Sequence, residues 1–211
     1  MKYEIIQTKP YPMAEFEIKS RAGNIGKAVK IHKTKKWTDW AFEIEFCGND
    51  CQMVFGEEEH LFMTLLKMRP WTPPENNPYR LYVNGIEAGK IYMHWGRDWM
   101  EINGRKYSTC TIGFGSAGLK CLVFEGWFDR RGNPGGKQIA LIETPNLGKL
   151  LDQYEVSAEG DIAGLVALFF GLYWDTNSFH KSDTYYEKVY LETWGKEKQL
   201  YDPTFKNQIM D

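Results

Sequence analysis

Hydrophobic and polar residues alternate in many short segments over the first three quarters of the chain. Strict alternation places every second side chain on one face, which is typical of a β-strand with one buried side. The clearest early example is Trp37–Phe46, in which Trp40, Phe42, Ile44 and Phe46 share a face. Shorter predicted strands of this kind are Tyr3–Gln7, Glu15–Ile18, Lys27–Lys33 and Gln52–Phe55.

Two Asn-Gly pairs interrupt the alternation, at residues 84–85 and 103–104. Asn-Gly is a preferred sequence for the two-residue type I′ turn that joins neighbouring antiparallel strands. Each pair therefore predicts both a β-hairpin and its register. The predicted opposite pairs are Val83 with Ile86, Leu81 with Ala88, and Glu101 with Lys106, the last being a favourable pair of opposite charges.

Further strands complete an antiparallel sheet. The additional predicted strands are Leu119–Phe128 and Lys137–Glu143, which flank the Gly/Pro-rich turn Asp129–Gly136, and Leu150–Ser157. Glu57–Arg69 is compatible with a helix or with a buried strand, and Pro70–Pro78 predicts a loop. The chain thus holds about ten to twelve strands, and an antiparallel sheet of that size tends to curl or close into a barrel.

One long apolar run lies near the C-terminal end, DIAGLVALFFGLYWD at residues 161–175. It lacks proline and has no polar face, and Asp161 can cap its start, so it predicts a helix over residues 161–174 that is buried on every side. Such a helix spans ~20 Å, less than the ~30 Å hydrocarbon core of a bilayer. A signal anchor or membrane hairpin is the competing interpretation. A closed barrel with this helix inside accommodates both patterns.

The segment YEVSAEGDIAGLVALFFGLYWD, which follows the many short strands, resembles the ending of the tubby C-terminal-like superfamily. That superfamily includes the tubby, phospholipid scramblase and LURP-one-related families. The resemblance covers residues 1–175 and implies a barrel of about twelve strands around one hydrophobic helix. Asp161 stands without the other acidic ligands that a calcium loop requires. No functional residue is carried over from these families.

The predicted fold is therefore mainly β, of the α+β class, with a barrel domain over residues 1–175 and a C-terminal extension over residues 176–211. Within the extension, Thr184 and Glu187 have the spacing of a capping box. We expect an amphipathic helix from Tyr185 to about Lys198. This helix would either pack on the barrel or join two copies in a homodimer.

Composition limits the classes of partner. The 211 residues carry a formal net charge of −2, so nothing points to nucleic acid. The first residues lack the apolar segment of a secretory signal, and we expect a cytoplasmic protein that can lie peripherally at a membrane. Four cysteines are expected to be free thiols without metal. The alternatives are half a zinc site at Cys47 and Cys51, or a disulfide between Cys110 and Cys121.

No common catalytic motif is visible, and we assign no catalytic residue and no cofactor. Residues 113–118, GFGSAG, satisfy the dinucleotide pattern G-x-G-x-x-G, but strands flank them on both sides and predict a hairpin loop. His94, Arg97 and Asp98 form a polar cluster among tryptophans. They predict either a hairpin end held by hydrogen bonds or the rim of an enzyme or small-ligand site at a barrel end.

The strongest local charge signal is Lys19–Lys36, which contains seven Lys and Arg residues and no acid. Such a stretch can bind the phosphates of an anionic phospholipid surface, or it can be a solvated face. The candidate anion-binding residues are Lys27, Lys30, Lys33, Lys35 and Lys36. The sequence thus predicts a non-catalytic binding or scaffold module. The alternatives are an enzyme or small-ligand binder, and a purely structural protein that dimerises.

Overall fold

The computed structural model describes residues 1–10, 13–32, 40–55, 79–92, 98–114, 118–144, 151–175 and 196–210. Three predicted segments lie outside these residues: Glu57–Arg69, the Pro70–Pro78 loop, and the part of the amphipathic C-terminal helix before residue 196. Residues 196–198 of that helix are described, and they belong to a 3-10 helix.

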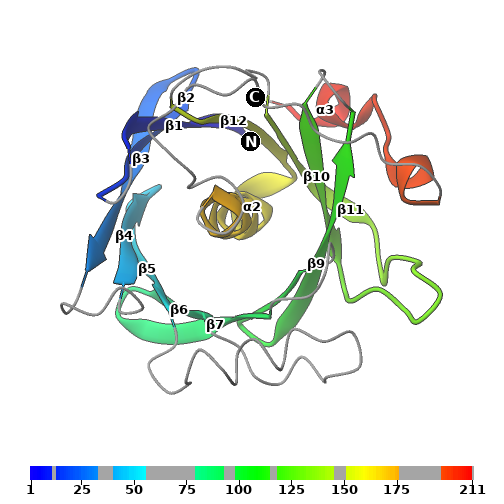
Figure 1. The fold of residues 1–211 in the computed structure, drawn as a ribbon, viewed down its shortest axis with the longest axis horizontal. Coiled ribbons are helices and arrows are strands. Elements are labelled where there is room, and N and C mark those ends of the chain that lie inside the picture. The colour runs from blue at the N-terminus through cyan, green and yellow to red at the C-terminus, as the bar shows by residue number, and fades with distance from the viewer. Residues whose placement is uncertain are drawn as a thin grey trace.

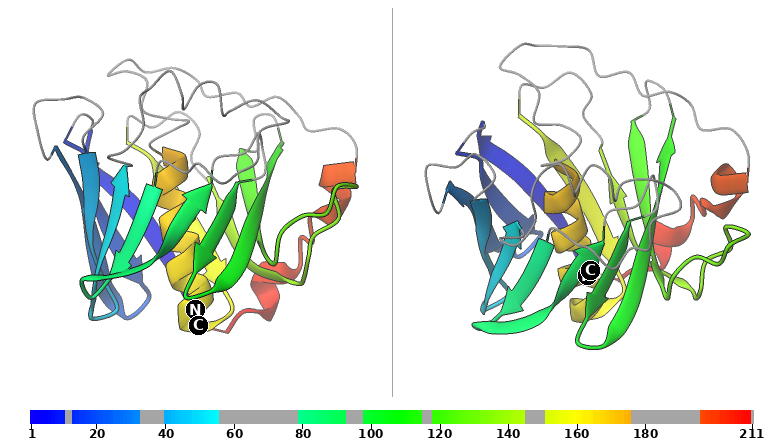
Figure 2. Two further views of the ribbon diagram at one scale, coloured as in Figure 1. Left: turned by 90° about the horizontal axis from the view of Figure 1, so that it is seen from below. Right: turned by 60° about the horizontal axis from the view of Figure 1, so that its bottom comes forward.

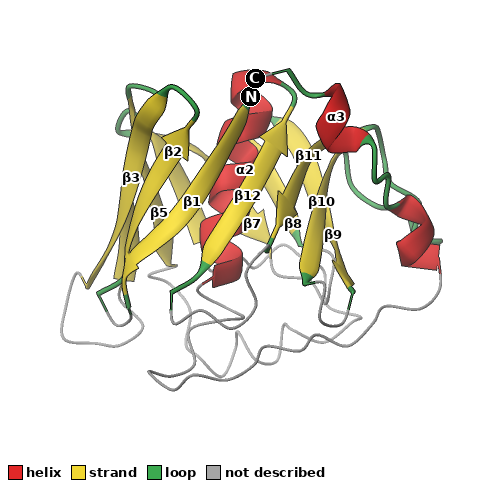
Figure 3. Cartoon of the chain, turned by 90° about the horizontal axis from the view of Figure 1, so that it is seen from above, coloured by secondary structure: helices red, strands yellow, loops and turns green. Residues whose placement is uncertain are grey.

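Twelve antiparallel strands form a closed barrel (Figures 1 and 3). Each strand pairs with its neighbours in the sequence, and the pairing of β1 with β12 closes the sheet. The strands are β1 (Lys2–Lys9), β2 (Glu15–Ser20), β3 (Gly23–His32), β4 (Trp40–Phe46), β5 (Asn49–Phe55), β6 (Tyr79–Val83), β7 (Ile86–Tyr92), β8 (Trp99–Ile102), β9 (Arg105–Gly113), β10 (Leu119–Glu125), β11 (Gln138–Glu143) and β12 (Gln153–Ala158). The predicted closed antiparallel β-barrel is confirmed.

Both Asn-Gly turns form as the sequence predicts. Asn84 and Asn103 adopt positive φ angles of 51° and 50°, and a glycine follows each with φ of 78° and 72°. Val83 lies opposite Ile86, and Glu101 lies opposite Lys106. The predicted pairing of Leu81 with Ala88 is wrong. A β-bulge between Leu81 and Tyr82 shifts the register by one residue, and Leu81 lies opposite Gly89.

A helix, α2 (Gly160–Trp174), forms where the apolar run predicts one. Figure 1 shows α2 in the middle of the ring of strands. Eleven of its 15 residues are buried, and nine of these join side chains of the strands in one hydrophobic core. The prediction that Asp161 caps the helix is wrong. The helix begins at Gly160, so Glu159 occupies the N-cap position and Asp161 lies in the first turn. Among the helices that the structure describes, none has the length and apolar character needed to cross a bilayer.

Two glycines let β1 pack closely against α2. The Tyr3 hydroxyl donates a 2.7 Å hydrogen bond to the carbonyl of Gly164. A Cβ atom added to Gly164 would lie 2.6 Å from Sδ of Met1, just before β1, and one added to Gly171 would lie 2.9 Å from Cδ1 of Ile5. Both distances are shorter than such atoms normally approach. The absence of side chains at these two positions therefore fixes how near the helix lies to this strand.

The C-terminal residues pack on the outside of the barrel (Figures 1 and 3). They form a 3-10 helix, η3 (Lys196–Leu200), and a short helix, α3 (Phe205–Gln208). Phe205 and Ile209 join a second hydrophobic cluster with residues of β9, β10 and β11. Met1 lies near the other end of the described chain, because its amino group donates to the carbonyls of Ala158, at 2.9 Å, and Met210, at 3.2 Å. Figure 2 shows both termini at the same end of the barrel.

Candidate functional site

A groove of about 610 Å³ lies on the outer face of the barrel. We call it the β1 groove, because β1 forms its floor between β2 and β12. One wall comes from α3. Its polar lining residues are Lys2, Glu4, Lys19, Ser20, Arg21, Glu155, Ser157, Lys206 and Asn207.

Strand register determines which side chains meet in the floor. Glu4 lies opposite Lys19 on one side and opposite Glu155 on the other. Lys2 lies opposite Ser157. Every second side chain along a strand lies on the same face. The side chains of these opposite pairs therefore all project from the outer surface of the barrel.

The wall of the groove is held in place by charge. Lys206 of α3 contacts Glu143 of β11, with 3.2 Å between Nζ and Oε2, and Lys120 of β10 binds the same carboxylate. Glu143 is only 4% exposed. The attraction of Glu143, followed by their hydrogen bond, raises the pKa of Lys206. Because a buried carboxylate requires a partner, this contact positions α3 beside β11.

The balance of charge in the β1 groove favours an anion. Its lining includes four cationic side chains and two carboxylates, a difference of +2, although the whole chain has a net charge of −2. Two of these cations also have acidic partners outside the lining: Lys19 forms a 2.5 Å ion pair with the half-buried Glu17, and Lys206 binds Glu143. A concave surface with an excess of one charge concentrates ligands of the opposite charge. Phosphates and carboxylates are therefore the natural ligands of the cationic part.

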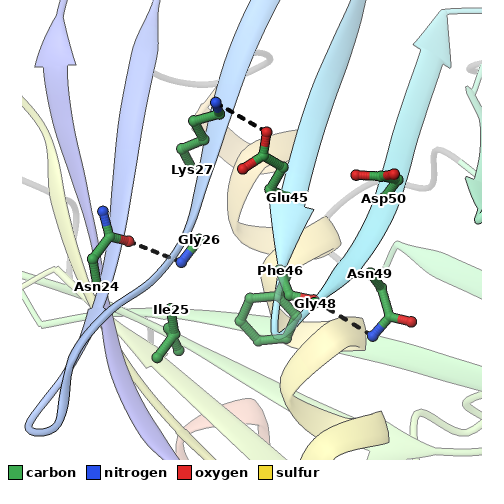
Figure 4. Close-up of a pocket in the computed structure, with 9 residues that line it drawn as sticks. All are labelled: Asn24, Ile25, Gly26, Lys27, Glu45, Phe46, Gly48, Asn49 and Asp50. Carbon is green, nitrogen blue, oxygen red and sulfur yellow. Dashed lines mark hydrogen bonds and ion pairs between the residues drawn. The ribbon is translucent and has the colours of Figure 1, made fainter.

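A second cavity, of about 390 Å³, lies at the β2–β3 and β4–β5 hairpins (Figure 4). Lys27 is its one cationic lining residue, against the carboxylates of Glu45 and Asp50. Nζ of Lys27 lies 2.9 Å from Oε1 of Glu45, and that ion pair raises the pKa of Lys27. This cavity therefore has an excess of negative charge and does not suit an anion.

Of the predicted anion-binding residues, the structure describes Lys27 and Lys30, and it places them on opposite faces of β3. Lys27 is exposed on the outer surface, whereas Lys30 is 7% exposed and lies opposite the core residue Phe42, which directs it into the barrel. Lys33, Lys35 and Lys36 lie outside the described residues. Lys19 and Arg21, from the start of the same basic stretch, line the β1 groove instead.

Lys30 belongs to a buried polar cluster at the C-terminal end of α2. Burial lowers the pKa of Lys30 from 10.5 to about 8, and the attraction of Asp175 opposes this change. Asp175 is fully buried, and the Tyr154 hydroxyl donates a 2.6 Å hydrogen bond to its Oδ1. Removing one partner of such a pair leaves an unpaired charge in the apolar interior, which strongly lowers the stability of the fold.

Asp98, from the predicted polar cluster, is also engaged inside the barrel. The Tyr173 hydroxyl donates a 3.0 Å hydrogen bond to Oδ1 of Asp98, and both residues are buried. Burial, with the nearby carboxylate, raises the pKa of Tyr173. His94 and Arg97 lie outside the described residues. Asp98 thus helps to fix the end of α2.

Cys110 and Cys121 lie on opposite sides of the barrel wall. Cys121 lies in the inner core, and Cys110 lies in the outer cluster beneath α3. Register places Leu122, not Cys121, opposite Cys110. The alternative of a Cys110–Cys121 disulfide is therefore wrong. Within the described part of the chain, no group of three or more His, Cys, Asp or Glu residues is placed to hold a metal ion.

Sequence reasoning missed the β1 groove because its residues come from both ends of the chain. Lys2 and Lys206 are isolated lysines about 200 positions apart, and no local pattern marks either of them. The absence of acids from Lys19 to Lys36 was the available signal, and it pointed further along the chain, to Lys27–Lys36.

Comparisons of the chain with protein-family models, with curated proteins and with solved structures found no match. The resemblance to the tubby C-terminal-like superfamily thus stays a prediction.

Proposed function

We propose that this chain is a non-catalytic binding module of tubby-like fold, and that its β1 groove binds the phosphate groups of anionic phospholipid headgroups. In this proposal the barrel encloses α2, which provides a rigid core, and the outer surface carries the ligand site. The observation that supports it is the gathering of Lys2, Lys19, Arg21 and Lys206 in one groove from three separate segments.

Physical chemistry sets the expected strength of this binding. Each Lys or Arg near an anionic membrane contributes about 1 kcal/mol, and the contribution falls off within a Debye length. Two carboxylates in the same groove oppose part of that attraction. We therefore expect weak and reversible attachment that decreases as the salt concentration rises.

The test is co-sedimentation of the full chain with phosphatidylcholine vesicles, with and without phosphatidylglycerol, at low and at physiological salt. The groove variant carries Lys2→Gln, Lys19→Gln and Arg21→Gln. The control variant loses the same number of charges at exposed lysines outside the groove, through Lys9→Gln, Lys90→Gln and Lys137→Gln.

We expect wild type and the control variant to sediment with the anionic vesicles, and the groove variant to remain largely in solution. Equal sedimentation of the two variants would show that the groove is not the binding site. A further variant, Lys33→Gln, Lys35→Gln and Lys36→Gln, tests the basic stretch that the sequence predicts. If only that variant loses binding, the site lies there and not in the β1 groove.

A further inference from the structure

The register of the barrel places three glutamates side by side on the outer surface. Glu4 lies opposite Glu155, and Glu155 lies opposite Glu143. Lys19 lies opposite Glu4 at one end of this row, and Lys120 lies opposite Glu143 at the other. Directly opposite side chains have Cβ atoms about 4.5–5.5 Å apart, so the carboxylates repel one another.

Only one of the three glutamates is closely held by cations from both sides. Glu143 binds Lys120 and Lys206. Glu4 accepts a 3.2 Å hydrogen bond from Nε2 of Gln153. Lys206 also attracts Glu155, but its stronger interaction is with Glu143. Glu4 and Glu155 both line the β1 groove, where a bound cation would relieve their repulsion.

The cationic part of the groove lies two residues further along the same strands. Lys2 and Ser157 are opposite each other, next to the Glu4–Glu155 pair. Two residues along a strand correspond to about 7 Å. Arg21 and Asn207 also line the groove. The groove therefore offers positive and hydroxyl groups at one position and two carboxylates a short distance away.

We propose that the β1 groove binds a phosphate ester that also carries a primary ammonium group, with the phosphate at Lys2 and Arg21 and the ammonium between Glu4 and Glu155. Among anionic phospholipids, the phosphatidylserine headgroup carries both of these groups, together with a carboxylate on the carbon that bears the ammonium. The inference rests on the proposed function, because the same groove must first bind phosphate. An ammonium group suits two carboxylates because its three donors can be shared between them.

The experiment compares phosphatidylcholine vesicles that contain equal fractions of phosphatidylserine or of phosphatidylglycerol. Both added lipids carry one net negative charge, but only phosphatidylserine has an ammonium group. We expect the full chain to bind the phosphatidylserine vesicles about two- to fivefold more tightly, the effect of one ion pair in a solvent-accessible groove. Competition by soluble glycerophosphoserine, and less by glycerophosphoglycerol, would attribute the preference to the headgroup and not to the membrane.

Two variants test the role of the carboxylates. Glu4→Gln with Glu155→Gln should bind both kinds of vesicle equally. Glu87→Gln with Glu125→Gln removes two exposed carboxylates outside the groove and should keep the preference. Persistence of the preference in the groove variant would overturn the inference.

The outcomes for wild type separate this inference from the proposed function. Equal binding to the two kinds of anionic vesicle, above binding to phosphatidylcholine alone, would overturn the inference and leave the proposed function in place. Absence of binding to either anionic vesicle would overturn both. Equal competition by the two soluble headgroups would show that the ammonium group is not recognised.

Discussion

The Tyr154 hydroxyl donates a 2.6 Å hydrogen bond to Oδ1 of Asp175. This bond joins β12 to the residue that follows α2, and both side chains are at most 1% exposed. Asp175 also attracts the ammonium group of Lys30 on β3. The C-terminal end of the helix is therefore linked to two strands through one buried carboxylate. Tyr154 and Lys30 offset the free-energy cost of removing that carboxylate from water.

Removing the Tyr154 hydroxyl should destabilise the fold. Tyr154→Phe keeps the ring but deprives the carboxylate of Asp175 of a donor, and we expect a loss of about 1–3 kcal/mol in the free energy of unfolding. Urea denaturation followed by tryptophan fluorescence measures it. Tyr82→Phe, at a half-buried tyrosine, is the matched control and should change stability by less than about 0.5 kcal/mol. Equal effects of the two substitutions would contradict a special role for the Tyr154–Asp175 bond.

Lys30 should make stability rise with pH in the alkaline range. Its pKa is about 8 in the folded protein and 10.5 as the ordinary value, so between these pH values the unfolded chain holds the proton and the folded chain does not. Stability increases with pH wherever the unfolded state binds more protons. Between pH 7.5 and 9.5, wild type should therefore gain roughly 2 kcal/mol relative to Lys30→Met.

The measurement is urea denaturation of both proteins at the two pH values. Comparison with Lys30→Met removes the effect of the other lysines and tyrosines, which titrate in both proteins. A constant difference between them would show that Lys30 keeps an ordinary pKa in the folded state.

Local sequence chemistry explains why most of the barrel could be predicted. Asn84 and Asn103 adopt the positive φ angles that Asn-Gly turns require, and those turns fix the pairing of Val83 with Ile86 and of Glu101 with Lys106. The bulge beside Leu81 could not be predicted in this way. A β-bulge inserts one extra residue into a strand and so shifts the register. Because tertiary packing favours the bulge, the alternation of hydrophobic and polar residues need not reveal it.

The side chains that face the interior depend on partners far along the sequence. In β3, Ala28 and Lys30 share the face that turns toward the helix, although Val29 and Ile31 are the more hydrophobic residues. Asp175, which attracts Lys30, lies 145 residues later. The β1 groove has the same origin, because the pairing of β1 with β12 and the packing of α3 bring Lys2 and Lys206 together.

The proposal that the barrel encloses α2 predicts that a charge at its centre prevents folding. Leu168 is fully buried within the helix. Leu168→Asp introduces a carboxylate without a partner, and we expect a loss of at least about 5 kcal/mol, which is the whole stability of a domain at the lower end of the ordinary range. Circular dichroism and thermal melting measure the result. Ile162→Asp is the control, because Ile162 is 58% exposed on the same helix and should tolerate the change. A cooperative melt of the Leu168→Asp variant near the wild-type temperature would contradict an enclosed helix.

Burial should divide the four cysteines by reactivity. Cys47 is exposed, whereas Cys51, Cys110 and Cys121 are buried. Burial raises the pKa of Cys51 and Cys121, and partial loss of hydration, with the nearby charge of Asp161, raises that of Cys47. Few of these thiols are therefore ionised near neutral pH. An aromatic disulfide reagent at pH 8 should modify one thiol per native chain, slowly, and all four in denaturant. Cys47→Ser should abolish the native reaction. Rapid reaction of two or more native thiols would mean that the core or the outer cluster opens readily.

The close approach of Ile5 to Gly171 predicts a pair of substitutions that compensate each other. Gly171→Ala places a Cβ atom 2.9 Å from Cδ1 of Ile5, and overpacking of this kind costs about 1–3 kcal/mol. Ile5→Val removes that δ-methyl group and alone costs about 0.5–1.5 kcal/mol through the space it leaves. In the double variant the new methyl group occupies that space, and alanine adds about 1 kcal/mol of helix propensity over glycine. The double variant should therefore be more stable than Gly171→Ala alone, with a coupling energy of at least about 0.5 kcal/mol in urea denaturation. Strictly additive effects would mean that Ile5 and Gly171 do not touch, and that β1 lies further from α2.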